Sequence, residues 1–290
     1  MQLFLQSLMN GIVVGSVYTL VAVGFALTFS VMHVINFAHG EFYMVGSFMT
    51  FMVMRYIVDD FWVALLVSVV IGAGLGFLVE RVFRPSYGKG LLTQFIIALG
   101  LVIVLQQAML IIFGGQPKAV RSAYPTVHTL GVVSITDERL LVIGVSVALV
   151  VALFIFLNRT KTGKAMRAAA GNPLAARLVG ISTHRMASLA FIVGIALAAV
   201  AGALLAPLYS INPFMGMRLT GVAMVIVVVA GIGSVGGAAI VGYVIGIVEN
   251  LFAAYVSPEW SFAVMFALLI VVLLIKPMGL FGKERAGVAM

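Results

Sequence analysis

Long apolar runs separated by short polar gaps dominate the sequence. Charged and turn-forming residues divide it into nine apolar segments, most of which approach the roughly 20 residues that a membrane-spanning helix needs. Two segments are weaker, because 219–232 is short and 36–54 begins with polar residues. We therefore expect an all-α, polytopic transmembrane helix bundle of eight or nine spans, with room for one broken or re-entrant segment. The nine apolar segments are 3–29, 36–54, 61–79, 91–113, 140–157, 187–208, 219–232, 236–256 and 260–275.

The composition excludes a water-soluble globular protein. Of the 290 residues, 63% are hydrophobic and 9% are charged, and the mean hydropathy is +1.22. So few charges cannot cover a water-exposed surface, and the apolar side chains must face lipid. The net charge of +8 does not indicate nucleic-acid binding, because Lys and Arg are confined to the gaps between apolar runs. The absence of Cys excludes disulfides, thiolate metal sites and cysteine nucleophiles.

The positive charges predict the orientation of the chain. Most of the 17 Lys and Arg residues lie in three gaps, at 81–89, 159–185 and 276–285, which contain few acidic residues. The positive-inside rule places these gaps in the cytoplasm, with the N-terminus outside and the C-terminus cytoplasmic. The first forty residues contain no charged residue and are expected to form a retained first span. The outer gaps, 114–139 and 209–218, are either simple connections or landing surfaces for an external protein.

Glycines recur at a spacing of four residues within the apolar segments. Residues four apart lie on one face of a helix, and small residues there allow two helices to approach closely in lipid. We expect helix packing rather than a catalytic loop at each pair. The pairs are Gly11 with Gly15, Gly72 with Gly76, and Gly242 with Gly246.

The gap at 158–185 contains two short helical patterns. An Ala-rich run over 164–170 predicts one helix. A second helix is predicted to start with Asn172 as N-cap and Pro173 as its first residue, and to end at Gly180. A helix of about two turns is unstable alone in water and needs a surface to rest on. By composition alone, a helix lying on anionic headgroups is favoured over a docking element that presents small residues to a cytoplasmic partner.

Four stretches in register resemble a known family. The loop at 163–181 is similar to the cytoplasmic coupling loop of ABC importer permeases, and the run 11–48, with its Asn-Phe-Ala-His-Gly-Glu core at 36–41, resembles the opening of the LivH-type permeases of branched-chain amino acid uptake. The glycine-rich 230–250 and the ending Lys-Pro-Met-Gly-Leu-Phe-Gly at 276–282 resemble later parts of that family. The resemblance covers essentially the whole chain. Permeases for urea or short amides share much of the pattern and stay an alternative.

The resemblance implies one transmembrane permease domain over 1–290, with a cytoplasmic coupling loop at 158–185. The implied partners are a second, LivM-like permease, two cytoplasmic ATPase subunits, an external solute-binding protein and the lipid of a bacterial inner membrane. ATP would be bound by the partners, with no cofactor in this chain, and the sequence lacks the G-x-x-x-x-G-K-[ST] phosphate loop. We therefore expect a transport subunit and not an enzyme. Its expected coupling residues are Arg167, Asn172, Pro173, Ala175, Ala176, Arg177 and Gly180.

Polar residues open the second apolar segment. Asn36, His39 and Glu41 lie at its expected cytoplasmic start, and a charged group at membrane depth is costly unless it is paired or hydrated. A metal site that includes His33 is the weakest interpretation, because no fourth ligand is evident. A network that caps a broken helix is favoured for His39 by itself. Pathway lining or gating near the inner mouth is the hypothesis for Asn36 and Glu41, and His39 stays a candidate for it.

Glu249 presents the same problem in the outer half of its segment. It is expected to face the transport pathway or to pair with Arg218, and the ion pair is slightly favoured. Gln106 is expected to hydrogen-bond between helices or to face a subunit interface. An ion-coupled secondary transporter that uses Glu41 and Glu249 as coupling carboxylates is the main alternative function.

Overall fold

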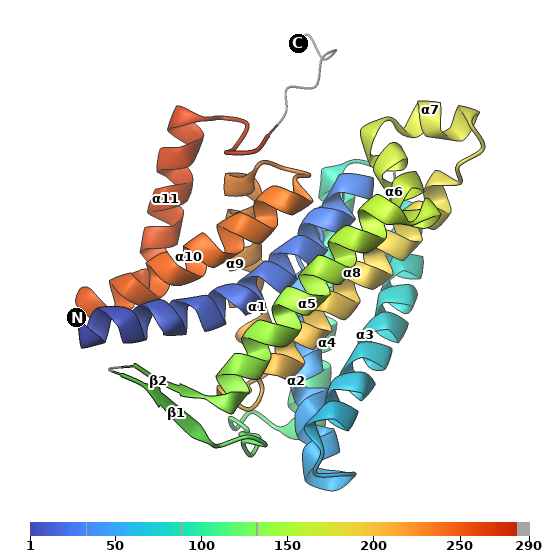
Figure 1. The fold of residues 1–290 in the computed structure, drawn as a ribbon. Coiled ribbons are helices and arrows are strands. Elements are labelled where there is room, and N and C mark those ends of the chain that lie inside the picture. Colours follow the sequence, from blue (N-terminus) through green and yellow to red (C-terminus); the bar gives the residue numbers. More distant parts are fainter. Residues whose placement is uncertain (33, 88, 132, 283–290) are drawn as a thin grey trace.

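The computed structural model describes residues 1–32, 34–87, 89–131 and 133–282. His33 and the end of the positive gap at 276–285, which includes Lys283 and Arg285, lie outside these ranges. The described part is helical apart from one small hairpin, which confirms the expected class (Figure 1). The helices are α1 (Gln2–Met32), α2 (His39–Tyr56), α3 (Phe61–Phe83), η1 (Arg84–Ser86), α4 (Leu91–Phe113), α5 (Asp137–Arg159), α6 (Lys161–Gly171), α7 (Pro173–Leu178), α8 (Thr183–Leu205), α9 (Met215–Ala230), α10 (Val235–Tyr255) and α11 (Ser261–Ile275).

Each of the nine apolar segments forms one helix in this part of the chain. Among the described residues, six helical stretches are long and apolar enough to cross a membrane, namely α1, α3 with η1, α4, α5, α8 and α10. The helices α9 and α11 are apolar but shorter. The structure therefore supports a polytopic membrane protein.

The helix α1 lies inside the bundle and other helices lie around it. In the most apolar 18-residue window of each helix, 83% of α1 is buried, against 22% of α4 and of α5. The helices α8 and α10 pack along α1. Since α4 and α5 leave most of their apolar side chains uncovered, they are suited to face lipid or another subunit.

The spaced glycines allow helix backbones to touch, as expected. A Cβ atom on Gly246 of α10 would lie 2.4 Å from the Gly15 Cα of α1, and one on Gly11 would lie 2.7 Å from the Ile247 Cα. A Cβ atom on Gly72 of α3 would lie 2.6 Å from the Ala199 Cβ of α8. Any larger residue at these positions must push two helices apart.

We predict that Gly246→Val destabilises the fold strongly, by at least about 2 kcal/mol, because the new side chain collides with α1 backbone. Gly100→Val in α4 is the matched control, since a Cβ atom there meets no atom within 4 Å. Thermal unfolding of the purified protein in detergent measures both. Equal melting temperatures for the two variants would contradict the packing described here.

A two-stranded antiparallel hairpin precedes α5 and was not expected from the sequence. It consists of β1 (Val127–Leu130) and β2 (Val133–Thr136), with Gly131 at positive φ in the turn. Four-residue strands within a polar gap leave too short a pattern to distinguish them from a loop. The Thr136 side chain accepts a hydrogen bond from the Arg139 amide and caps α5.

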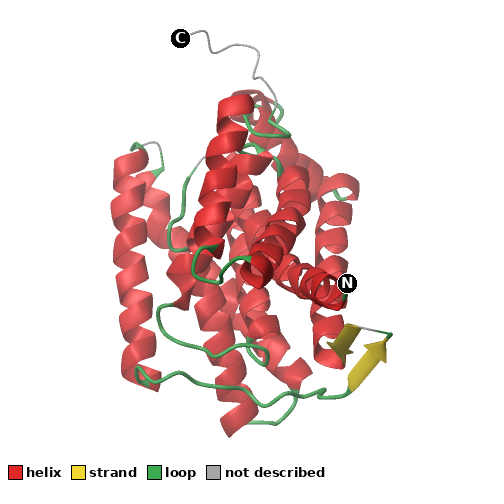
Figure 2. Ribbon diagram, turned by 90° about the vertical axis from the view of Figure 1, so that its left-hand side faces the viewer, coloured by secondary structure: helices red, strands yellow, loops and turns green. Residues whose placement is uncertain are grey.

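The hairpin and α7 lie at opposite ends of the molecule (Figure 1). Gln6 of α1 exchanges two 3.0 Å hydrogen bonds with the Ser134 backbone, and Arg139 donates to Asn10 at 2.6 Å. These bonds tie the N-terminal end of α1 to the hairpin, and Figure 2 shows the N-terminus beside the yellow strands. The last turn of α11 lies toward the end that holds α7.

Candidate functional site

The chain breaks between α1 and α2 and turns back into the bundle. Residues 34–38 are not helical, and α2 begins at His39. The His39 Nε2 lies 3.2 Å from the carbonyl oxygen of Val21, which is eleven residues before the end of α1, or about 16 Å back along the helix. Therefore α2 begins well inside the protein and not at its surface.

Asn36 and His39 stabilise this break. The Asn36 Oδ1 accepts a 3.0 Å hydrogen bond from the Ala38 amide, and the His39 ring meets the Phe25 ring edge-on at 5.4 Å. Both polar side chains are buried, and the Asn36 Nδ2 and His39 Nδ1 have no hydrogen-bond partner in the described part of the chain. No side-chain hydrogen bond caps the first turn of α2, so the capping and pathway roles of Asn36 and His39 stay predictions.

Glu41 is completely buried where α2, α4 and α9 meet. Its Oε1 accepts a 2.9 Å hydrogen bond from the Gln106 Nε2, as expected for Gln106 between helices. Its Oε2 has no partner among the described residues. The Gly216 backbone of α9 closes the site, because a Cβ atom there would lie 2.6 Å from that Oε2.

Glu41 lies deep in the bundle and not at either end of it. Its partner Gln106 lies 15 residues beyond Leu91, about 22 Å along α4, and only seven residues before Phe113 at the hairpin end. This depth arises because 34–38 descends into the bundle before α2 begins. Glu41 consequently lies closer to the hairpin end than to the end that holds α7.

Two glycines bring α2 and α9 into direct backbone contact beside Glu41. The Gly40 amide donates to the Thr220 Oγ1 at 2.9 Å, and a Cβ atom on Gly40 would lie 2.1 Å from the Gly216 carbonyl oxygen. Sequence reasoning missed Gly216 and Thr220, because Gly216 is not one of the spaced glycine pairs and Thr220 lies within an apolar segment. Their role depends on a crossing between helices far apart in the chain.

Glu249 forms the expected ion pair with Arg218. The Arg218 Nη2 lies 2.9 Å from the Glu249 Oε1, and the other carboxylate oxygen, Oε2, has no partner in the described part. The Glu249 side chain is 7% exposed and the Arg218 side chain is 62% exposed. The carboxylate of the pair is therefore buried, and its arginine partner lies at the surface of the subunit. Gly216 contacts Glu41 and Arg218 contacts Glu249, so the two buried carboxylates flank the first turn of α9.

The helix α7 has the expected boundaries. The Asn172 Oδ1 accepts hydrogen bonds from the amides of Leu174 and Ala175 at 3.1 and 3.0 Å, and Pro173 is the first helical residue. Gly180 follows with φ +81, a conformation that glycine adopts at helix ends. The Arg177 Nε donates to the Pro173 carbonyl oxygen at 3.3 Å.

The surface of α7 is formed by aliphatic side chains and not by its alanines alone. Leu174, Leu178 and Val179 are 65%, 81% and 75% exposed, whereas Ala176 is 3% exposed. The expectation that Ala176 faces a partner is therefore wrong, although Ala175 is exposed. Leu174 and Leu178 are four residues apart, so helical periodicity alone would have placed them on one face.

A polar cluster ties α3 to the start of α8, directly after α7. The buried Glu80 accepts hydrogen bonds from the Ser188 Oγ at 2.8 Å and from the Arg84 Nη2 at 3.1 Å. Burial, and then the Glu80 charge, raises the pKa of Tyr87, whose phenol stays protonated and donates to Glu80 at 3.3 Å. The first turns of α8 are thus anchored to α3.

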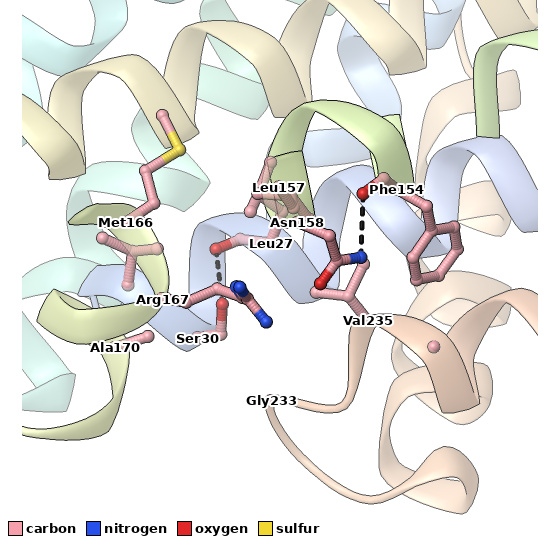
Figure 3. Close-up of a pocket in the computed structure, with 12 residues that line it drawn as sticks. Leu27, Ser30, Phe154, Leu157, Asn158, Met166, Arg167, Ala170, Gly233 and Val235 are labelled. Atoms are coloured by element: carbon pink, nitrogen blue, oxygen red, sulfur yellow. Dashed lines mark hydrogen bonds between the residues drawn. The ribbon is translucent and has the colours of Figure 1, made fainter. Parts of the chain in front are cut away.

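Arg167, an expected coupling residue, belongs to α6 and not to α7. Arg167 borders a pocket between α6, α1, α5 and the start of α10 (Figure 3). No group of three His, Asp or Glu side chains among the described residues is placed to hold a metal ion.

Comparison with known proteins gives consistent matches. A family model described as the permease component of branched-chain amino acid transport systems matches residues 7–273. The high-affinity branched-chain amino acid transport system permease LivH of Escherichia coli K12 is 37% identical, over 97% of this chain and 96% of its own length. BraD of Pseudomonas aeruginosa is 34% identical, over 97% of both chains. A probable LivH of Methanocaldococcus jannaschii is 27% identical, over 95% of this chain and 91% of its own length.

Proposed function

Because this chain belongs to the permease family of branched-chain amino acid transport systems, we propose that it forms part of the membrane channel of an ABC importer for branched-chain or similar small apolar amino acids. Identity of 37% that extends over 97% of the chain is the observation that supports this most strongly. The chain is an inner-membrane permease with several apolar helices of membrane-spanning length.

The proposed complex contains a second, LivM-like permease subunit, two cytoplasmic ATPases and an external solute-binding protein. In it, this chain is a single membrane domain without a cofactor of its own, and the ATPases bind ATP. The exposed aliphatic face of α7, formed by Leu174, Leu178 and Val179, is suited to an apolar groove on an ATPase. A short helix with such a face needs a protein surface to cover it.

The proposed topology has nine crossings with the N-terminus outside. The N-terminal end of α1 is tied to the hairpin, whereas α11 ends toward α7. The start of α1 and the end of α11 therefore lie at opposite ends of the bundle. An odd number of crossings is required for this arrangement. The broken segment formed by 34–38 and α2 counts as one crossing. The positive charge around α6 and α7 supports a cytoplasmic position for that end of the bundle.

We propose that movement of α7 reaches the buried carboxylates through α8. Residues 179–182 connect α7 to α8, and α8 packs against α1, α2 and α3. A Cβ atom on Gly202 of α8 would lie 1.9 Å from the Tyr43 carbonyl oxygen of α2, two residues after Glu41. Helices in such close contact move together, so a shift of α8 is expected to displace α2.

Glu41 and Glu249 are the proposed pathway or gate residues. A carboxylate buried at membrane depth costs several kcal/mol unless it is paired. Glu41 accepts a hydrogen bond from Gln106, whereas Glu249 is paired with Arg218 and lies beside the buried Tyr18 phenol. Each carboxylate retains one oxygen without a partner in the described part. An ammonium group of an amino acid supplies the donor that such an oxygen lacks. The ion-coupled alternative would use the same carboxylates to carry protons.

Reconstitution distinguishes the two functions. We predict that proteoliposomes holding this chain, its permease partner and the ATPases accumulate leucine only with ATP and the binding protein present. Proteoliposomes with this chain alone and a proton or sodium gradient are the comparison. Accumulation in the second set without ATP would refute the ABC importer and favour the ion-coupled transporter.

A further inference from the structure

A pocket of about 240 Å³ opens between α6 and the inner ends of α1, α5 and α10 (Figure 3). We propose that it binds a small aliphatic carboxylic acid, of about the size of a branched-chain amino acid. The pocket is separate from Glu41 and Glu249, which lie toward the hairpin half of the bundle, and no transport step described above uses it.

The charge of the pocket favours an anion. Arg167 extends from α6 into the space that Ser30 and Val235 border (Figure 3). It has no hydrogen bond or ion pair to any described residue, and no acidic side chain lines the pocket. The Ser30 hydroxyl donates to the Leu27 carbonyl and one N–H of Asn158 donates to the Phe154 carbonyl, so the Arg167 guanidinium is the charged donor of the pocket.

The start of α10 adds to this preference. Val235 and Gly236 line the pocket and are the first two residues of α10, so their amides have no partner within the helix. The N-terminal end of a helix of 21 residues also contributes partial positive charge. A carboxylate between these amides and Arg167 would accept hydrogen bonds from both sides.

The rest of the pocket favours a short hydrocarbon chain. The side chains that line it are mostly apolar. Phosphate or sulfate has no hydrocarbon group that could pack against these side chains. Its volume lies below the roughly 300–1,000 Å³ of pockets that enclose drug-sized ligands, which suits a branched chain of a few carbons. The main apolar lining residues are Leu27, Val31, Phe154, Leu157, Met166 and Ala170.

Binding here would join α6 to α1 and α10. Since α6 leads directly into α7, an acid in the pocket would restrain the coupling segment. This consequence rests on the proposed function, whereas binding itself does not. The test therefore uses the isolated chain, so its failure is distinguishable from failure of the import role.

The probe is 4-methylpentanoate, and 4-methyl-1-pentanol is its uncharged counterpart. Saturation-transfer NMR on the full chain in phosphatidylcholine nanodiscs gives the dissociation constants. We expect Arg167→Gln to weaken carboxylate binding at least tenfold without changing that of the alcohol. Ala170→Phe should abolish binding of both, with an unchanged melting temperature as the check on folding.

Lys164→Gln is the matched control, because Lys164 and Arg167 are both exposed on α6 and carry the same charge, but only Arg167 lines the pocket. Carboxylate binding should survive this change. Equal weakening by Lys164→Gln and Arg167→Gln, or no effect of Arg167→Gln, would overturn the proposal. Loss of the site when phosphatidylglycerol replaces phosphatidylcholine would identify a lipid headgroup as the occupant and would also overturn it.

Discussion

Leu178→Asp is expected to reduce ATP-driven uptake at least tenfold while the permease stays folded. Leu178 is 81% exposed at the end of α7, so a charge there does not disturb the interior of this subunit. Burying a leucine side chain in an interface is worth about 1.5–3 kcal/mol, and a buried unpaired carboxylate adds a further cost. Docking of the ATPase should therefore weaken by more than tenfold, as measured by copurification and by leucine uptake in proteoliposomes.

Two variants separate docking from folding. Ala168→Asp introduces the same charge at an exposed position on α6 and should retain uptake. Ala176→Asp places a charge at a buried position and should lower the melting temperature in addition to uptake. Full uptake by Leu178→Asp, or equal losses in Leu178→Asp and Ala168→Asp, would show that α7 does not dock in the proposed way.

Glu41→Gln is expected to abolish most transport without preventing assembly. Glutamine keeps the shape of the side chain, and its carbonyl oxygen can still accept the hydrogen bond from Gln106. The change removes the negative charge beside Gly216 and puts an amide group where the free Oε2 was. Initial uptake rates should fall at least tenfold, while ATPase subunits still copurify.

The partner of Glu41 provides a matched pair of variants. Gln106→Leu removes the one hydrogen bond that Glu41 accepts from a described residue, and uptake should fall with it. Gln107→Leu makes the same change at the next position, which is exposed, and should leave uptake intact. Wild-type uptake by Glu41→Gln would make that carboxylate a bystander.

Several features could be predicted because they depend on the local chain. The membrane environment follows from hydrophobic content, and the ends of α6 and α7 follow from a glycine stop, an Asn N-cap and a Pro at the first helical position. The pairing of Glu249 with Arg218 was predictable because a buried carboxylate requires a partner and few cations lie at the right depth.

The position of Glu41 could not be predicted, because it depends on the path of 34–38. Polar residues before a helix are compatible with an exposed linker and with a break inside the bundle. Only the contacts of His39 with Val21, and of Glu41 with Gln106, distinguish the two. These contacts join residues 18 and 65 positions apart, a separation that no local pattern encodes.

The sequence by itself therefore determined the membrane class, the helical segments, the glycine faces and the short helix that precedes α8. Tertiary structure alone decided the depth of α2, the burial of Ala176 and the pocket at Arg167. The physical reason is that hydrophobicity, capping and spacing act within a few turns of one helix. Depth, burial and cavities arise where helices from distant parts of the chain cross, and backbone contacts such as those of Gly40 with α9 set that geometry.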